Sequence, residues 1–253
     1  MGEKNSSKTR VTPLMDYLGN DVTKINSFLN LFNKHPKIKG SKIDIFYGTK
    51  KDGQKGEKAI PAPVSLLKWY IEHPDKLSRK ENIQNKSGYP VQETIDNREA
   101  FFNGDTDKRK EALDGIQKLK DKKISPLPWY VFEGDTHPDI YIETESEIFV
   151  GEAKRTEPKL TGSVKWFKQR DQLIRHVDSV IDCGKKVYSF FILDRVDYPN
   201  LEKHGKDFDY YKNSLPHRSD EEVKKIMETY IGCITWDELE QDFPELKKLF
   251  SKE

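Results

Sequence analysis

Short apolar runs alternate with amphipathic stretches along the chain, and this pattern predicts strands interleaved with helices. Residues 140–142 and 148–150 are two apolar runs joined by a polar segment, which is typical of a β-hairpin. Residues 186–194 are apolar on both faces, as expected of a central strand, and residues 231–236 predict another buried strand. The pattern therefore predicts an α/β fold in which helices cover both faces of a sheet.

Helical spacing of apolar residues predicts further elements on both sides of the hairpin. Residues 161–182 carry this spacing up to Gly184 and predict one long helix between the hairpin and the central strand. Residues 126–133 predict a strand directly before the hairpin. A strand is also expected after Gly40, and helices are expected over residues 12–32, 63–73, 91–102, 108–120 and 220–230 and at the C-terminus.

The length of the chain, 253 residues, suits one large domain or a core with a smaller attached domain. Residues 75–88 are polar and offer the best linker between two such parts. We therefore expect a mostly helical N-terminal region at residues 1–90, as a candidate recognition part. The α/β domain is expected at residues 91–253.

The composition indicates a polar but folded chain. Hydrophobic and charged residues each make up 34%, and aromatic residues make up 11%, more than a disordered chain would carry. The formal net charge is +1, so overall charge predicts no strong attraction to nucleic acid. Any basic surface must therefore be local.

Cysteine content and hydropathy bear on location. The two cysteines make neither a disulfide framework nor a zinc site. No apolar run approaches the roughly 18 residues that span a membrane, and no apolar segment follows the charges at the N-terminus. We therefore expect a cytoplasmic protein without a membrane partner.

Three charged residues fall where the hairpin would bring them together. Asp139 opens the first strand, and Glu152 and Lys154 lie two residues apart near the end of the second, so they share one face. Strand pairing then places Asp139 nearly opposite Glu152. Two carboxylates suit Mg²⁺, which prefers oxygen ligands and lowers the pKa of a bound water. Lys154 would stabilise negative charge on the nucleophile and on phosphate, and the carbonyl of Ala153 is a further candidate ligand.

The sequence PD at residues 138–139, a spacer of twelve residues and EAK at residues 152–154 resemble the PD-(D/E)XK phosphodiesterase superfamily, the restriction-endonuclease-like nucleases. The resemblance covers residues 99–236. It implies an αβββαβ core with a mixed sheet flanked by helices. It also implies that the two acids are metal ligands and that Lys154 positions or activates water.

Two alternatives compete with this assignment. Glu157-Pro158-Lys159 repeats the acid-x-lysine spacing, but proline cannot donate a ladder hydrogen bond, so the earlier pair is preferred. The hairpin could also be a solvated element with ordinary surface charges. Against this, Glu152 and Lys154 continue the alternation of the apolar residues before them and should point to the buried side. A charge there is costly unless it is paired or bound to metal.

Further residues are candidates for the same site. Glu133 ends the strand predicted before the hairpin and could approach Asp139 as an additional ligand. In some branches of the resembled superfamily, a glutamine on the helix after the lysine strand reaches the site. Gln169 and Gln172 match that placement, and His176 lies on the same helical stripe.

The best candidate for a phosphate-contacting surface is the loop at residues 50–58, which holds four lysines against two acids. The first sixty residues carry 12 Lys plus Arg against 6 Asp plus Glu, so this loop belongs to a basic region. A solvated loop that contacts no nucleic acid is the alternative. The candidate nucleic-acid contacts are Lys50, Lys51, Lys55 and Lys58, together with Arg170 on the predicted long helix.

We therefore expect a metal-dependent endonuclease that hydrolyses phosphodiester bonds in DNA, with Mg²⁺ as its cofactor and Mn²⁺ as a substitute. The resemblance implies a restriction or other defence enzyme, although repair and recombination nucleases share the core. Cutting both strands would favour a homodimer, because one metal cluster serves one strand at a time. The alternative is a nucleic-acid-binding or protein-interaction module that keeps the fold without catalysis.

Overall fold

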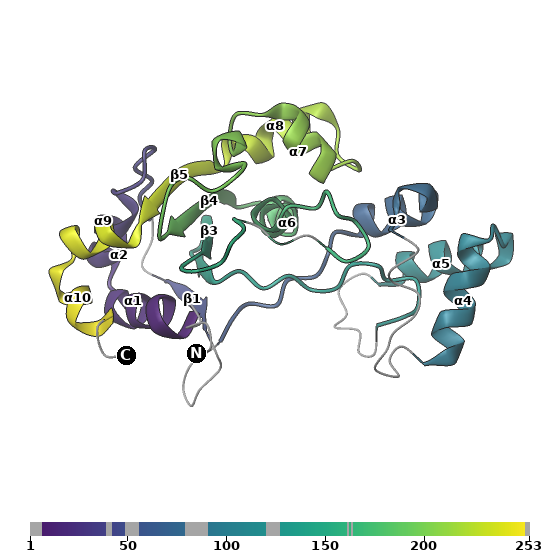
Figure 1. The fold of residues 1–253 in the computed structure, drawn as a ribbon, viewed down its shortest axis with the longest axis horizontal. Helices are drawn as coiled ribbons and strands as arrows, with labels where there is room; N and C mark the ends of the chain where they lie inside the picture. Colours follow the sequence, from purple (N-terminus) through teal and green to yellow (C-terminus); the bar gives the residue numbers. More distant parts are fainter. Residues whose placement is uncertain are drawn as a thin grey trace.

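A five-stranded mixed sheet forms the centre of the molecule (Figure 1). The computed structural model describes residues 7–38, 42–48, 56–78, 91–119, 127–160, 162 and 164–250. The strands are β1 (Asp44–Tyr47), β2 (Ile140–Glu143), β3 (Glu147–Ala153), β4 (Lys186–Leu193) and β5 (Tyr230–Thr235), and they lie in that order across the sheet. The β1–β2 and β2–β3 pairs are antiparallel, and the β3–β4 and β4–β5 pairs are parallel. The prediction of an α/β fold with helices flanking the sheet is confirmed.

β2 and β3 form the predicted hairpin. Ile140 lies opposite Gly151, in the register that the alternation of apolar residues predicts. The amide of Thr144 donates to the carbonyl of Glu147 at 2.9 Å and closes the turn. A Cβ atom at Gly151 would lie 2.4 Å from the ring of Phe190 on β4, so the close packing of these strands requires glycine.

One face of the sheet packs against helices from both ends of the chain (Figure 1). These helices are α1 (Thr12–Leu18), α2 (Val22–Leu29), α9 (Trp236–Asp242) and α10 (Pro244–Phe250). Their shared core with the sheet includes Leu14, Phe28, Phe149, Phe190, Ile192 and Leu246. Strand β1 and helices α1 and α2 all precede residue 90, so the sheet and this core draw on both sides of the boundary predicted there.

The other face packs against α6 (Gln172–Asp178), α7 (Phe208–Ser214) and α8 (Asp220–Glu228). The carboxylate of Asp171 caps α6 by accepting from the amide of Ile174 at 2.9 Å. A capping box at Ser219 and Glu222 begins α8. The core on this face includes Tyr141, Val150, Ile174, Val177, Val187, Leu215 and Val223.

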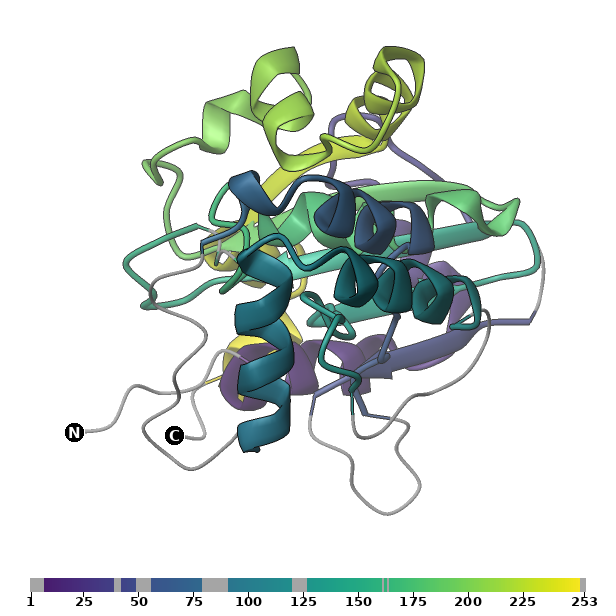
Figure 2. The same ribbon diagram turned by 90° about the vertical axis from the view of Figure 1, so that its right-hand side faces the viewer.

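A helical extension lies beyond one end of the sheet (Figure 1), and Figure 2 shows it in front of the sheet. It contains α3 (Val64–Glu72), α4 (Gln92–Phe102) and α5 (Thr106–Gln117), all between β1 and β2 in sequence. Its separate apolar core includes Tyr70, Phe101, Ile116, Trp129, Phe132 and Trp166. Short helical turns are η1 (Ser7–Val11), η2 (Pro74–Lys76), η3 (Ile181–Cys183) and η4 (Leu201–Lys203). Within the described ranges, no helix is long and apolar enough to cross a membrane.

The strand predicted at residues 126–133 is wrong. From residue 127 onward this stretch consists of turns and irregular chain. Its aromatic residues pack against the helices of the extension rather than against the sheet, as Trp129 and Phe132 show. The third antiparallel strand beside the hairpin is β1, which comes from much earlier in the sequence.

The long helix predicted over residues 161–182 is also wrong over most of its length. Only α6 is α-helical, because Asp171 caps it and the preceding chain takes another course. Val164 and Phe167 form an isolated β-bridge there. The single C-terminal helix is divided in two where Pro244 begins α10. The other predicted helices and strands are present, with ends that differ by a few residues.

Candidate active site

The hairpin brings Asp139, Glu152 and Lys154 together. Asp139 directly precedes β2, and its Oδ2 accepts a hydrogen bond from the amide of Ala153 on β3 at 2.9 Å. The side chain of Glu152 points from the same strand to the face that α6 covers. The Nζ of Lys154 lies 2.5 Å from Glu152 Oε1. The three residues that carry the sequence motif therefore form one cluster.

Glu152 and Lys154 are buried, and hydrogen bonds hold the backbone of Lys154. Glu152 is 2% exposed and Lys154 is 7% exposed, as the strand alternation predicts. The backbone of Lys154 is fixed on both sides, because its amide donates to the carbonyl of Ile192 at 2.8 Å and its carbonyl accepts from Trp236 Nε1 at 2.8 Å. The end of β3 is thus tied to β4 and to the start of α9.

Burial and mutual charge set the protonation of the acids. Burial, followed by the charge of Glu152, raises the pKa of Asp139 from its ordinary value of 3.8 to about 8. Burial also raises the pKa of Glu152, although the charge of Lys154 opposes this. Burial alone would lower the pKa of Lys154, but the charge and hydrogen bond of Glu152 and the charges of Asp139 and Glu157 together raise it. At neutral pH Asp139 is therefore mostly protonated and its carboxyl group donates to Glu152, whose Oε1 accepts from the ammonium group of Lys154.

His176 is part of the cluster, although the sequence assigned it no role. Its Nε2 lies 3.0 Å from Glu152 Oε2, and its Nδ1 lies 2.6 Å from the hydroxyl of Thr136. Burial lowers the pKa of His176 to about 3, so the imidazole is neutral at neutral pH. The available signal was the helical stripe that His176 shares with the two candidate glutamines.

Glu57 is a second neighbour that sequence reasoning missed. Burial, followed by the charge of Asp139, raises the pKa of this carboxyl, which therefore lies within electrostatic reach of the pair. The amide of Glu57 donates to the carbonyl of Gly48 at 3.0 Å and holds the chain after β1 near the hairpin. In the sequence, the lysines around Glu57 predict phosphate contacts and not a role for this acid in the site.

The donor set fits a divalent cation through two carboxylates. Among the residues that the structure describes, no group of three or more His, Cys, Asp or Glu side chains is arranged to hold a metal ion. Asp139, which is partly exposed, and the buried Glu152 are nonetheless adjacent acids whose joint ionisation a cation would stabilise. These two would hold Mg²⁺, and a contribution from the Ala153 carbonyl stays a prediction.

Glu133 and Arg170 belong to a different cluster. Arg170 is 0% exposed, and its guanidinium contacts Glu133 Oε2 at 3.3 Å and Asp178 Oδ2 at 2.6 Å. It also donates to the carbonyl of Ser214 at 3.1 Å. Glu133 accepts from the hydroxyl of Tyr70 at 2.8 Å. The prediction that Arg170 contacts phosphate is therefore wrong, and Glu133 serves this buried ion-pair network rather than the Asp139 cluster.

The remaining candidates that the structure describes are exposed or have contacts with residues outside the motif. Gln169 is exposed, and Gln172 Oε1 accepts from the amide of Gly162 at 3.2 Å. Lys58 lies over the ring of Phe46 at 4.3 Å. Lys50, Lys51 and Lys55 lie outside the described residues.

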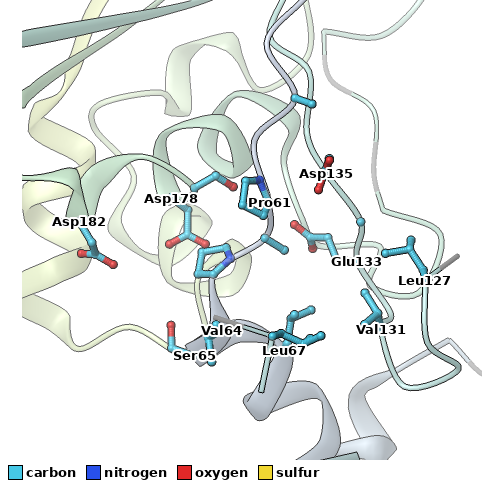
Figure 3. A pocket seen from close by; sticks show the side chains of 16 residues that line it. Pro61, Val64, Ser65, Leu67, Leu127, Val131, Glu133, Asp135, Asp178 and Asp182 are labelled. Carbon is cyan, nitrogen blue, oxygen red and sulfur yellow. The ribbon is translucent and has the colours of Figure 1, made fainter. Parts of the chain in front are cut away.

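A cavity of about 670 Å³ opens between the helical extension and α6 (Figure 3). Pro61, Leu67 and Val131 contribute apolar wall, and Glu133 and Asp178 line it as acids. Arg170, Arg175 and Arg218 already pair with these two acids, and Arg218 also pairs with Asp182, a further acid of the lining. None of the three motif residues lines this cavity, so the candidate active site lies elsewhere.

Comparison with known proteins adds no relative. No family model, curated protein or solved structure matches this chain. The assignment of function therefore depends on the geometry of the cluster and on the topology of the sheet.

Proposed function

We propose that this chain is a metal-dependent endonuclease of the PD-(D/E)XK type that hydrolyses phosphodiester bonds in DNA. The observation that carries the proposal is the convergence of Asp139, Glu152 and Lys154 at the ends of β2 and β3. Burying a lysine beside two acids costs folding free energy, and charged clusters of this kind are typical of functional sites.

The topology supports the same proposal. Helix α2, strands β1, β2 and β3, helix α6 and strand β4 follow one another in the αβββαβ order that the resemblance implies. The first three strands are antiparallel neighbours, and α6 connects the parallel strands β3 and β4. The helical extension is an insertion between the first two strands of this core.

Each residue of the cluster has a distinct role in the proposed reaction. Asp139 and Glu152 would hold Mg²⁺ or Mn²⁺, and the ion would supply Lewis-acid chemistry by polarising the phosphoryl oxygen and lowering the pKa of a bound water. Lys154 stays charged because Glu152 lies beside it. Its ammonium orients the attacking water and stabilises the negative charge that develops on phosphate.

The chain that follows β3 supports DNA as the substrate. Lys159, Lys165 and Lys168 are exposed on the segment that leads from the site to α6. Lysines on such a segment can contact phosphates on either side of a scissile bond. Since the net charge of the whole chain is only +1, this local basic surface is what would attract nucleic acid.

A second candidate function is a binding module that keeps the fold without catalysis. It is favoured by the contacts of Glu152, whose two oxygens are already paired with Lys154 and His176. Such a module would bind DNA or a protein partner and would not need the cation.

The test is cleavage of plasmid and genomic DNA with Mg²⁺, Mn²⁺ or EDTA by the natural chain and by Asp139→Ala. We expect metal-dependent cutting that the variant lacks. Asp96→Ala on the exposed surface of α4 is the matched control and should cut like the natural chain. DNA binding without cutting under any metal would favour the binding module, and calorimetric titration with Mn²⁺ would then show whether the acids bind an ion.

A further inference from the structure

A buried histidine links the site to the loop that precedes it. His176 on α6 is 1% exposed, and its two ring nitrogens each have a partner. Nε2 lies 3.0 Å from Glu152 Oε2, and Nδ1 lies 2.6 Å from Thr136 Oγ1. Thr136 is itself fixed, because its backbone exchanges two hydrogen bonds with Ile60 at 2.9 and 2.7 Å.

The partners define where the ring proton lies. A carboxylate that binds a metal ion is deprotonated, so in the proposed function the Oε2 of Glu152 can only accept, and its Oε1 accepts from the ammonium group of Lys154. Nε2 must therefore carry the hydrogen. A neutral imidazole has one N–H, so Nδ1 accepts and the hydroxyl of Thr136 donates.

We propose that His176 is a positioning residue, which together with Lys154 fixes the orientation of the Glu152 carboxylate. Lys154 holds Oε1 from the strand, and His176 holds Oε2 from the helix above it. With both oxygens held, the carboxylate cannot turn away from Asp139. The proposal rests on the proposed function, in which Glu152 is a metal ligand.

A purely structural role for this histidine explains the contacts less well. Ile174 and Val177 already anchor α6 in the apolar core on this face of the sheet. His204 is also buried, and neither of its ring nitrogens has a hydrogen-bond partner among the described residues. The carboxylate of Asp171 lies 3.6 Å from the Nε2 of His204, which is longer than a hydrogen bond. A buried histidine in this fold therefore does not need two hydrogen bonds, whereas His176 makes both.

The first test compares His176→Leu, which removes the donor, with His176→Gln, whose amide can still reach Glu152. We expect His176→Leu to weaken Mn²⁺ binding and to lower kcat, each by about 10–100-fold, with little change in KM for DNA. His176→Gln and the milder Thr136→Val should fall between this variant and the natural chain. Affinity is measured by calorimetry on the folded protein, and kcat and KM by plasmid cleavage.

The matched control is His204→Leu, the same replacement at a buried histidine outside the cluster. It should change thermal stability while leaving Mn²⁺ affinity unchanged. A folded His176→Leu with the affinity and kcat of the natural chain would overturn the proposal. So would equal losses of Mn²⁺ affinity in both histidine variants, because such losses would follow from core damage alone.

A second measurement separates this inference from the proposed function. Nitrogen-15 NMR of the imidazoles should show His176 as neutral with its proton on Nε2, and Glu152→Gln should shift that signal. A proton on Nδ1 would overturn the positioning role even in an active enzyme. A natural chain that shows the Nε2 proton but neither binds Mn²⁺ nor cuts DNA would refute the nuclease and leave the contact with Glu152 supported.

Discussion

Trp236 donates a hydrogen bond from its indole Nε1 to the backbone carbonyl of Lys154 at 2.8 Å. The two residues are far apart in sequence, and the contact joins the start of α9 to the end of β3. The indole is buried and packs edge-on against Phe250 of α10. The C-terminal helices therefore support the strand end that carries the candidate catalytic lysine.

Replacing Trp236 with phenylalanine should loosen this strand end. The variant keeps an aromatic ring but leaves the buried carbonyl of Lys154 without its donor, which costs about 1–3 kcal/mol in the free energy of unfolding. Urea denaturation measures the loss. Trp129→Phe is the control, because its indole binds the carboxylate of Glu111 on a more exposed surface. An equal or larger loss in the control would contradict the special role of Trp236.

Lys154→Met should abolish turnover while DNA binding persists. The variant keeps the alkyl chain but removes the charge that we assign to the water and the phosphate, so kcat should fall by at least about 10²-fold. Lys154 is buried, so the affinity for DNA measured by fluorescence anisotropy in Ca²⁺ should change little. Lys68→Met on the exposed face of α3 is the control. A kcat of Lys154→Met within a factor of ten of the natural chain would contradict the role assigned to Lys154.

Asp139→Asn should stabilise the metal-free protein at alkaline pH. The folded state raises the pKa of Asp139 to about 8, so it binds more protons than the unfolded state between about pH 4 and pH 8. The natural chain therefore loses stability as pH rises through this window, whereas the neutral amide does not. Because Asp139 is partly exposed, we expect a gain of about 1–3 kcal/mol at pH 9 and little gain at pH 4. The stabilities are measured by denaturation in EDTA. Curves that coincide for both proteins at pH 9 would contradict the raised pKa of Asp139.

Asp178→Asn should destabilise the protein by about 3–5 kcal/mol at neutral pH, because it leaves Arg170 buried beside a neutral group. Burial alone would raise the pKa of Asp178, but the charge of Arg170 and the neighbouring cations lower it below its ordinary value of 3.8. This contribution is present above about pH 4 and is lost as pH falls through the lowered pKa.

Urea denaturation at pH 7, 5 and 3 checks the size and the sign of this effect. The difference between the natural chain and Asp178→Asn should be largest at pH 7 and should shrink towards pH 3. Asp197→Asn, in an exposed pair with Arg195, should change stability by less than about 0.5 kcal/mol at each pH. A difference that grows on acidification would contradict the assigned ionisation of Asp178.

The hairpin and the motif could be predicted because their signals are local. The alternation at residues 148–150 continues into Glu152 and Lys154, so one pattern places both the strand and the chemistry on the buried face. β4 and β5 could also be predicted from the sequence, because strands that are covered on both faces are continuously apolar. These features depend on the period of a strand and not on distant contacts.

The errors arose where distant packing decides the structure. Trp129 and Phe132 have the composition of a strand, but they fill the core of the helical extension. Arg170 resembled a surface cation, yet its counter-charges Glu133 and Asp178 come from two separate segments. His176 could not be assigned to the site from the sequence. Its partner Thr136 lies in irregular chain before the hairpin, and no periodic pattern predicts their contact. Periodicity indicates which residues are buried but not what they are buried against.

The helical extension has a consequence for how the molecule assembles. β2 and β3 are joined by a tight turn, whereas the chain between β1 and β2 spans residues 48–139. The entropy lost on closing a loop grows with the logarithm of its length, so the pairing of β1 with β2 carries the largest closure cost in the sheet. The far end of that loop holds Thr136 and Asp139. The hairpin alone brings Asp139 to Glu152, but the backbone of Thr136 is held by Ile60 near the start of the same long connection. The support that Thr136 gives to His176 therefore depends on a contact across that connection.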